Sequence, residues 1–174
     1  MKLLFLLRGL PGSGKSTFIK QNNLTNFTLD LDEIGSKNLV PMTDPSVLFD
    51  KKKMDEFKRF VYNQYKNYLL NCIEKRMQNN EIIILDGTHI KPGKIERYLD
   101  LLNKYNYDFY CIDFSDIPIE KCKLQNKMRI RSKWISEEKI DLMYKLLQEQ
   151  VLPNNLNVIT RNEFLTLFSF LKKD

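Results

Sequence analysis

Near its N-terminus the chain reads Gly9-Leu10-Pro11-Gly12-Ser13-Gly14-Lys15-Ser16. This stretch matches the pattern G-x-x-x-x-G-K-[ST] at every fixed position, and it follows an apolar run at residues 2–7 that is typical of a buried strand. In such a loop, glycines let backbone N–H groups turn inward around a phosphate, and the following helix adds the positive end of its dipole. The stretch therefore predicts a strand, a phosphate-binding loop and a helix in succession.

The side chains of this loop predict how a nucleoside triphosphate would be held. Lys15 would reach the β- and γ-phosphate oxygens, and Ser16 would offer its hydroxyl to Mg²⁺. An ordinary strand-to-helix turn gives no reason for either residue. A dinucleotide-binding loop is excluded because Thr17 stands where the third glycine of G-x-G-x-x-G belongs. The expected nucleotide-binding residues of the loop are Gly12, Ser13, Gly14, Lys15, Ser16 and Thr17.

The rest of the chain alternates between predicted strands and predicted helices. Apolar runs predict further strands at residues 27–31, 82–85, 107–114 and 156–160. Apolar side chains recur with helical spacing at residues 54–73, 95–102, 140–147 and 162–172. This alternation predicts an α/β chain with the three-layer P-loop NTPase fold, in which helices flank a mostly parallel sheet of about five strands. We expect residues 1–174 to form a single domain, with a long loop at residues 35–50 on the active-site side.

The composition excludes several classes of protein. Of the 174 residues, 43% are hydrophobic and 29% are charged, as in ordinary globular domains. The apolar runs are far shorter than the roughly 20 residues of a membrane-spanning helix, and no signal-peptide cleavage pattern follows the first run. Cys72, Cys111 and Cys122 form no Cys-x-x-Cys pair, which indicates reduced packing residues. We therefore expect a cytoplasmic protein with no membrane partner.

Two predicted strands end in carboxylates. The run Leu29-Asp30-Leu31-Asp32-Glu33 places Asp30 or Asp32 near the γ-phosphate, where a carboxylate could accept the proton of an attacking hydroxyl. Of the two, Asp32 is the better candidate for this base; the alternative is that either residue caps a short helix. Asp86 follows the strand at residues 82–85 in the manner of a Walker B carboxylate, which holds Mg²⁺. Thr88 and His89 would then line the acceptor cleft, although His89 could also be an ordinary loop histidine.

Charge points to anionic partners. The 28 basic and 22 acidic residues give a net charge of +6, which favours nucleotides, nucleic acid or phosphorylated metabolites. Between residues 121 and 133 the chain has no acid and carries a cluster of bases: Lys121, Lys123, Lys127, Arg129, Arg131 and Lys133. Residues 121–135 could form a lid that closes over the triphosphate, or the bases could form a solvated helix face.

Together these elements resemble the kinase domain of the bacteriophage-type polynucleotide 5′-hydroxyl kinases, within the P-loop kinase group. Residues 9–17 are similar to that family's phosphate loop, and Asp32 falls where the family has its general-base Asp. Residues 86–89 are similar to the family's Asp-Thr-Asn segment, and residues 122–144 to its lid and following helix, with Arg129 at the lid arginine that contacts the donor phosphates. The resemblance covers about residues 1–150.

Three features depart from this family. Gly35 stands where an arginine three residues after the base helps to hold the acceptor's phosphate, and Gln125 replaces another usual lid arginine. Arg131 could bind the donor in place of that second arginine. The chain ends at Asp174 without a phosphatase domain, so any phosphatase or ligase partner is expected to be a separate protein.

The resemblance implies a nucleic acid repair enzyme, a kinase that uses ATP or another nucleoside triphosphate with Mg²⁺ to phosphorylate 5′-hydroxyl ends of DNA or RNA. A virus-encoded protein that acts in the host cytoplasm fits this family. A small-molecule kinase is the main alternative, and a regulatory NTPase the next. The expected catalytic residues are Lys15, Asp32 and Arg129, with Arg131 as a further nucleotide contact; Ser16 and Asp86 would bind the metal, and Asp32, Asp86, Thr88 and His89 the substrate.

Overall fold

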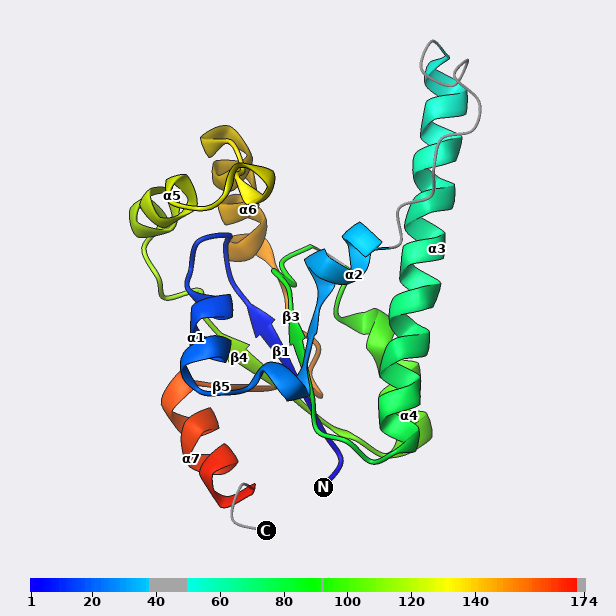
Figure 1. The fold of residues 1–174 in the computed structure, drawn as a ribbon, viewed down its shortest axis with the longest axis vertical. Coiled ribbons are helices and arrows are strands. Elements are labelled where there is room, and N and C mark those ends of the chain that lie inside the picture. Colours follow the sequence, from blue (N-terminus) through cyan, green and yellow to red (C-terminus); the bar gives the residue numbers. More distant parts are fainter. Residues whose placement is uncertain (38–49, 92, 172–174) are drawn as a thin grey trace.

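The computed structural model describes residues 1–37, 50–91 and 93–171. Within these ranges five strands form one parallel sheet in the order β2-β3-β1-β4-β5. Helices cover both faces of the sheet, so the predicted three-layer α/β P-loop fold is confirmed (Figure 1). The strands are β1 (Leu3–Arg8), β2 (Thr28–Asp30), β3 (Ile83–Asp86), β4 (Asp108–Asp113) and β5 (Asn157–Ile159).

The central strand β1 is buried on both faces, as its uninterrupted apolar sequence predicts. Leu4 and Leu6 pack in a core with α3 (Lys51–Gln78) and α4 (Leu99–Tyr105). Phe5 and Leu7 point the other way, into a core with α1 (Lys15–Gln21) and α7 (Arg161–Leu171). The alternation of side chains along one strand therefore fixes which helices lie on which face.

The helices α5 (Ile119–Lys127) and α6 (Glu137–Glu149) form a unit at the edge of the phosphate loop, joined by the short 3-10 helix η4 (Arg131–Lys133). Cys122 from α5 and Ile140 and Leu147 from α6 pack in one cluster with Leu10 of the loop. This cluster holds residues 121–135 beside the loop. No helix in the described ranges is both long and apolar enough to cross a membrane.

The long helix α3 is anchored at one end only. Asp50 caps its N-terminus by accepting hydrogen bonds from the Lys52 and Lys53 amides. The buried side chains of α3, Leu69, Ile73 and Met77, all lie in its C-terminal half. The N-terminal half extends beyond the sheet, on the side of α2 (Leu31–Lys37) (Figure 1).

The prediction of a loop at residues 35–50 is wrong for its first residues. Gly35 continues α2, which starts at Leu31, the last residue of a predicted strand. The reason is a local cap: Asp30 Oδ1 accepts hydrogen bonds from the amides of Asp32, at 2.9 Å, and Glu33, at 3.1 Å. Residues 38–49 lie outside the described residues.

Candidate active site

The phosphate loop joins β1 to α1 and takes backbone angles that only glycine adopts without strain. Gly12 has φ +80°, and a Cβ atom there would overlap the Cys122 carbonyl of α5. Gly14 has φ +91° and leads into α1, whose first turn contains no acidic residue. The loop and the positive end of α1 are therefore free to face an anion.

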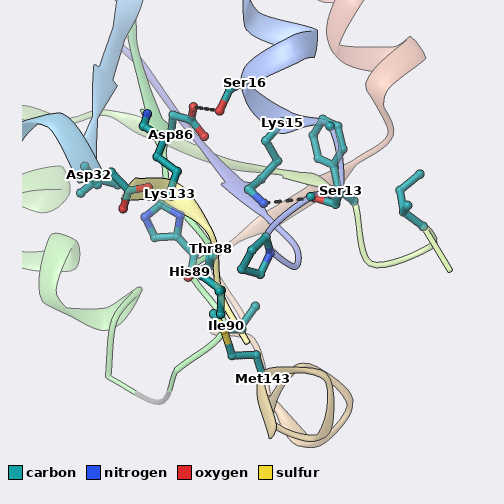
Figure 2. A pocket seen from close by; sticks show the side chains of 18 of the residues that line it. Ser13, Lys15, Ser16, Asp32, Asp86, Thr88, His89, Ile90, Lys133 and Met143 are labelled. Atoms are coloured by element: carbon teal, nitrogen blue, oxygen red, sulfur yellow. Dashed lines mark hydrogen bonds between the residues drawn. The ribbon is translucent and has the colours of Figure 1, made fainter. Parts of the chain in front are cut away.

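Lys15 is buried within this loop. Its Nζ donates to the carbonyl oxygens of Leu10, at 2.7 Å, and Gly9, at 2.9 Å. It also donates to Ser13 Oγ at 3.1 Å (Figure 2). Burial lowers the pKa of the amine to about 8, while the nearby Asp86 carboxylate opposes the shift. The three acceptors are neutral, so an arriving phosphate would give this cation a stronger partner than it has now.

Ser16 and Asp86 meet directly in front of the loop. Ser16 Oγ donates to Asp86 Oδ2 at 2.7 Å (Figure 2). Burial raises the pKa of Asp86, while the Ser16 hydrogen bond and Lys15 lower it. A hydroxyl and a carboxylate oxygen in contact are donors that suit Mg²⁺, which usually takes its other ligands from water and substrate phosphates. The predicted metal ligands are therefore placed together.

The two candidate carboxylates at the end of β2 and the start of α2 have different surroundings. Asp30 caps α2, lies opposite Asp86 in the register of β2 and β3, and has Lys133 Nζ at 3.8 Å. Asp32 lies in the first turn of α2, lines the cavity with Asp86, and makes no side-chain hydrogen bond or ion pair with the described residues (Figure 2). The structure thus assigns the cap to Asp30 and leaves the Asp32 carboxylate available.

His89 lines the cavity, but its ring is engaged inside the protein. Its Nδ1 lies 2.8 Å from the Leu7 carbonyl oxygen and its Nε2 lies 3.3 Å from the Tyr98 hydroxyl. Burial lowers the pKa of the imidazole to about 4, so it is neutral at pH 7. These contacts favour the alternative interpretation of His89 as a structural histidine.

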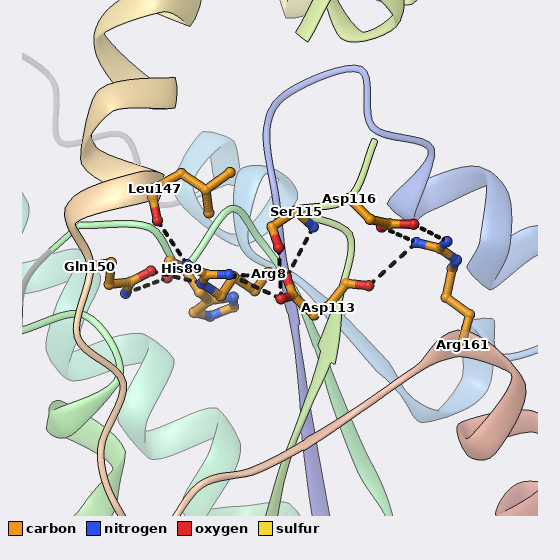
Figure 3. A network of polar contacts seen from close by, with 8 residues as sticks. All are labelled: Arg8, His89, Asp113, Ser115, Asp116, Leu147, Gln150 and Arg161. Atoms are coloured by element: carbon orange, nitrogen blue, oxygen red, sulfur yellow. Dashed lines mark hydrogen bonds and ion pairs between the residues drawn. The ribbon is translucent and has the colours of Figure 1, made fainter. Parts of the chain in front are cut away.

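A second polar network holds the His89 loop in place (Figure 3). The buried Arg8 pairs with Asp113 at 3.1 Å and donates to the side chain of Gln150 and to the carbonyl of Leu147. Gln150 Nε2 in turn donates to the His89 carbonyl oxygen at 2.9 Å. The end of α6 is thereby tied to β1, β4 and the loop after β3.

The basic segment divides into three groups. Lys123 and Lys127 form ion pairs with α6, to Asp141 at 2.7 Å and to Glu137 at 2.6 Å, and so face the neighbouring helix. Lys121, Arg129 and Lys133 line the cavity. Arg131 is exposed and lines neither this cavity nor the one beside it, so the structure does not place it at the nucleotide site. Of the two predicted arginine contacts, the geometry supports Arg129.

Asn126 closes the predicted lid on itself. Its buried side chain donates to the Ile135 carbonyl at 2.6 Å and accepts from the Ile135 amide at 3.3 Å. The chain from α5 to α6 therefore turns back in a fixed loop, and Arg129 lies within it.

Two cavities meet at Asp32. The first, of about 860 Å³, contains the phosphate loop, Asp86 and Thr88. The second, of about 960 Å³, lies between α2, α3 and the segment at residues 129–135, and its aromatic walls include Phe57, Tyr62, Tyr65 and Trp134. Asp32, Tyr65 and Arg129 line both.

Sequence reasoning missed several lining residues, above all Arg97 and Lys94 in the first cavity and Trp134 in the second. One signal for Arg97 was present: it stands between the core residues Ile95 and Tyr98, at the start of a helix that follows the carboxyl end of β3. Ligands of parallel sheets gather at that edge, so a cation there is a site candidate.

Comparison with known proteins places the chain among P-loop folds. A family model described as AAA domain matches residues 4–150. A chain of the Pnkp1/Rnl/Hen1 RNA repair complex superposes with a TM-score of 0.61 at 20% identity; the match covers 85% of this chain and 44% of that one, so the chain spans less than half of its length. A protein from Chloroflexus aurantiacus j-10-fl, described as a candidate kinase, gives a TM-score of 0.58 at 15% identity, with 97% of each chain covered. The curated proteins gave no match.

Proposed function

The chain belongs to the AAA domain family, and from that premise we propose that it is a Mg²⁺-dependent kinase that moves the γ-phosphoryl group of ATP, or another nucleoside triphosphate, to the 5′-hydroxyl end of a nucleic acid. One observation carries the proposal: Asp32, whose carboxylate has no partner among the described residues, lies where the phosphate-loop cavity meets the aromatic cavity. A base at that junction can serve a donor on one side and an acceptor on the other.

On the donor side, the loop amides and Lys15 would bind the β- and γ-phosphates, and Arg129 would approach the transferring group from the α5–α6 loop. Ser16 and Asp86 fit a Mg²⁺ site, and the ion would neutralise charge on the phosphates when it is bound. Transfer would then need positioning and charge stabilisation, with no covalent intermediate on the protein.

On the acceptor side, Asp32 would accept the proton of the attacking 5′-hydroxyl. The aromatic rings of the second cavity and its cations, Lys58, Arg129 and Lys133, suit a single nucleic acid strand, because nucleobases stack on aromatic rings and phosphates pair with cationic side chains. The structural neighbour in an RNA repair complex adds support for a nucleic acid acceptor and for partner proteins.

The second candidate is a kinase for a nucleoside, nucleotide or other small acceptor. Gly35 favours this second candidate, because α2 carries no arginine next to the proposed base Asp32. At position 35 the helix has only its backbone facing the Tyr65 ring. Salt separates the two candidates, because activity on a polyanion falls steeply with ionic strength whereas activity on a neutral nucleoside does not.

The test is transfer of labelled γ-phosphate to a matched panel. The panel holds 5′-hydroxyl DNA and RNA oligonucleotides, the same strands already 5′-phosphorylated, nucleosides and nucleoside 3′-phosphates. Label on the 5′-hydroxyl strands alone is the expected result. Label on small acceptors alone would establish the second candidate, and phosphate released only to water would indicate an NTPase.

A further inference from the structure

Arg97 is half-buried and forms no ion pair with a carboxylate among the described residues. It lies in the one-turn 3-10 helix η3 (Glu96–Tyr98) and lines the phosphate-loop cavity. Its Nη2 donates to the Tyr98 hydroxyl. Its Nε and Nη1 atoms are buried and have no hydrogen-bond partner in the described part of the chain. Buried arginine donors normally find partners, so two unpaired donors at a cavity wall indicate a site that suits an anionic group.

The guanidinium is held in position by a chain of buried groups. Tyr98 is fully buried, accepts from Arg97 and lies 3.3 Å from His89 Nε2. His89 Nδ1 reaches the Leu7 carbonyl, which can only accept, so Nδ1 carries the proton and Nε2 accepts from Tyr98. Hydrogen bonds through Tyr98 and His89 therefore connect Arg97 to the central strand β1 and fix the position of its guanidinium. The proposed reaction gives these two side chains no other role.

The surroundings of Arg97 place it on the acceptor side of the cavity. Lys94, also a cavity residue, donates to the Tyr62 hydroxyl at 2.8 Å. Burial raises the pKa of Tyr65, while the charge of Arg97 lowers it. Arg97, Tyr65 and Asp32 all line the phosphate-loop cavity, and Tyr62, Tyr65 and Asp32 also line the aromatic cavity beside it.

The residue of α2 that faces the Tyr65 ring is a glycine, so it brings no positive charge to the cavity. Gly35 of α2 faces the Tyr65 ring, with a distance of 3.7 Å from the place of a Cβ atom to the nearest ring carbon. An acceptor strand whose 5′-hydroxyl contacts Asp32 would bring its first internucleotide phosphate close to this carboxylate. Among the described cavity residues that follow β3, the cations Lys91, Lys94 and Arg97 form no ion pair with a described carboxylate, and Arg97 alone of the three has buried donors without a partner.

We propose that Arg97, supported by Lys94, forms the subsite for the first phosphate on the 3′ side of the acceptor nucleotide. The inference rests on the proposed function and sharpens it, because it makes that phosphate part of what the enzyme recognises. An acceptor with the phosphate, whether an oligonucleotide or a nucleoside 3′-phosphate, should be preferred over one without it. Arg97 is a binding and positioning residue here, and its effect falls on acceptor KM more than on kcat.

The experiment removes the charge from each partner in turn. Two 5′-hydroxyl oligonucleotides of one sequence are compared, with a phosphodiester or a neutral methylphosphonate as the first linkage. The proteins are the wild type, Arg97→Gln, Arg97→Lys and, as a remote control, Arg76→Gln, whose arginine contacts Asn26 and Glu81 away from the cavity. Circular dichroism and ATP-analogue binding check that each variant is folded.

The wild type and the Arg76→Gln control should lose about ten- to a hundredfold in kcat/KM on the neutral linkage, through KM. Arg97→Gln should treat both strands alike at the lower level, and Arg97→Lys should keep part of the difference. Equal discrimination by Arg97→Gln and the wild type would overturn the subsite.

Binding separates this result from a failure of the proposed function. Fluorescence polarisation with the same two strands, labelled at the 3′ end, requires no transfer. If the wild type phosphorylates neither strand but binds the charged one more tightly, and Arg97→Gln does not, the subsite stands and the assigned reaction fails. If the wild type binds both strands equally, the subsite is wrong whatever the activity.

Discussion

The donor and acceptor sides of the cavity are built differently. On the donor side, short hydrogen bonds hold Lys15, Ser16 and Asp86, and Lys15 and Asp86 are buried. On the acceptor side, Asp32 has no side-chain partner among the described residues, and the aromatic walls come from the exposed half of α3 and from the turn at Trp134. Under the proposed function, the first side would hold one kind of ligand closely, and the second would leave room for acceptors that differ in their bases.

The largest expected effect separates chemistry from donor binding. Asp32→Asn keeps the size of the side chain but removes the base, so kcat for transfer to a 5′-hydroxyl strand should fall by about 10²- to 10⁴-fold. ATP affinity should stay within a factor of about two, because the described structure shows no hydrogen bond from the Asp32 side chain to the phosphate loop. Single-turnover transfer and ATP titration measure the two effects; full turnover would remove Asp32 as the base.

Two neighbouring arginines test whether the donor side extends into the α5–α6 loop. Arg129 lines both cavities and Arg131 lines neither. Arg129→Ala should lower kcat by about 10³-fold, the lower range for an arginine that stabilises charge on a transferring phosphoryl group. Arg131→Ala should change it by less than about twofold. Equal losses in the two variants would show that general basicity of the segment matters and that the position of Arg129 does not.

Trp134 tests the acceptor side alone. It is 49% exposed and lines the aromatic cavity. Base stacking on one aromatic ring is worth about 1–3 kcal/mol, so Trp134→Ala should raise acceptor KM by about five- to a hundredfold while ATP KM is unchanged. Trp134→Phe keeps a ring and should recover most of the affinity. A rise in ATP KM instead would show that Trp134 also contributes to ATP binding, and would contradict the separation of a donor side from an acceptor side.

The smallest effect concerns pH and the donor side. Burial lowers the pKa of Lys15 to about 8, so in the free protein the amine is a cation below that pH and becomes neutral above it. A neutral amine attracts phosphate weakly, so ATP affinity should fall by up to about tenfold per pH unit above about pH 8. Lys15→Arg stays charged and should show a flat profile over the same range. A flat profile in the wild type would contradict the lowered pKa.

Local features of the sequence predicted the donor side because local backbone geometry makes it. The glycines at 12 and 14 take positive φ angles within the loop itself, and Asp86 ends a strand whose apolar run is unmistakable. The five strands were also predicted from local sequence, because each one coincides with an apolar run. The helical start at Leu31 was missed because the Asp30 cap outweighs the low helix propensity of Gly35.

The acceptor side was hard to predict because its residues come together only through long-range packing. Arg97 is oriented through Tyr98 and His89 by the carbonyl of Leu7, which is far away in the chain. The choice between Arg129 and Arg131 depends on the turn that Asn126 closes through Ile135. No spacing rule connects such residues, so the sequence could suggest a basic segment but could not say which of its members reaches the cavity.

The most direct test is a crystal structure of the protein with Mg²⁺, a non-hydrolysable ATP analogue and a 5′-hydroxyl dinucleotide. We expect the γ-phosphate at Lys15 and the acceptor O5′ within about 2.6–3.2 Å of an Asp32 carboxylate oxygen, with the acceptor base in the aromatic cavity. An acceptor bound elsewhere, with Asp32 turned away from its O5′ and from the γ-phosphate, would contradict the central claim.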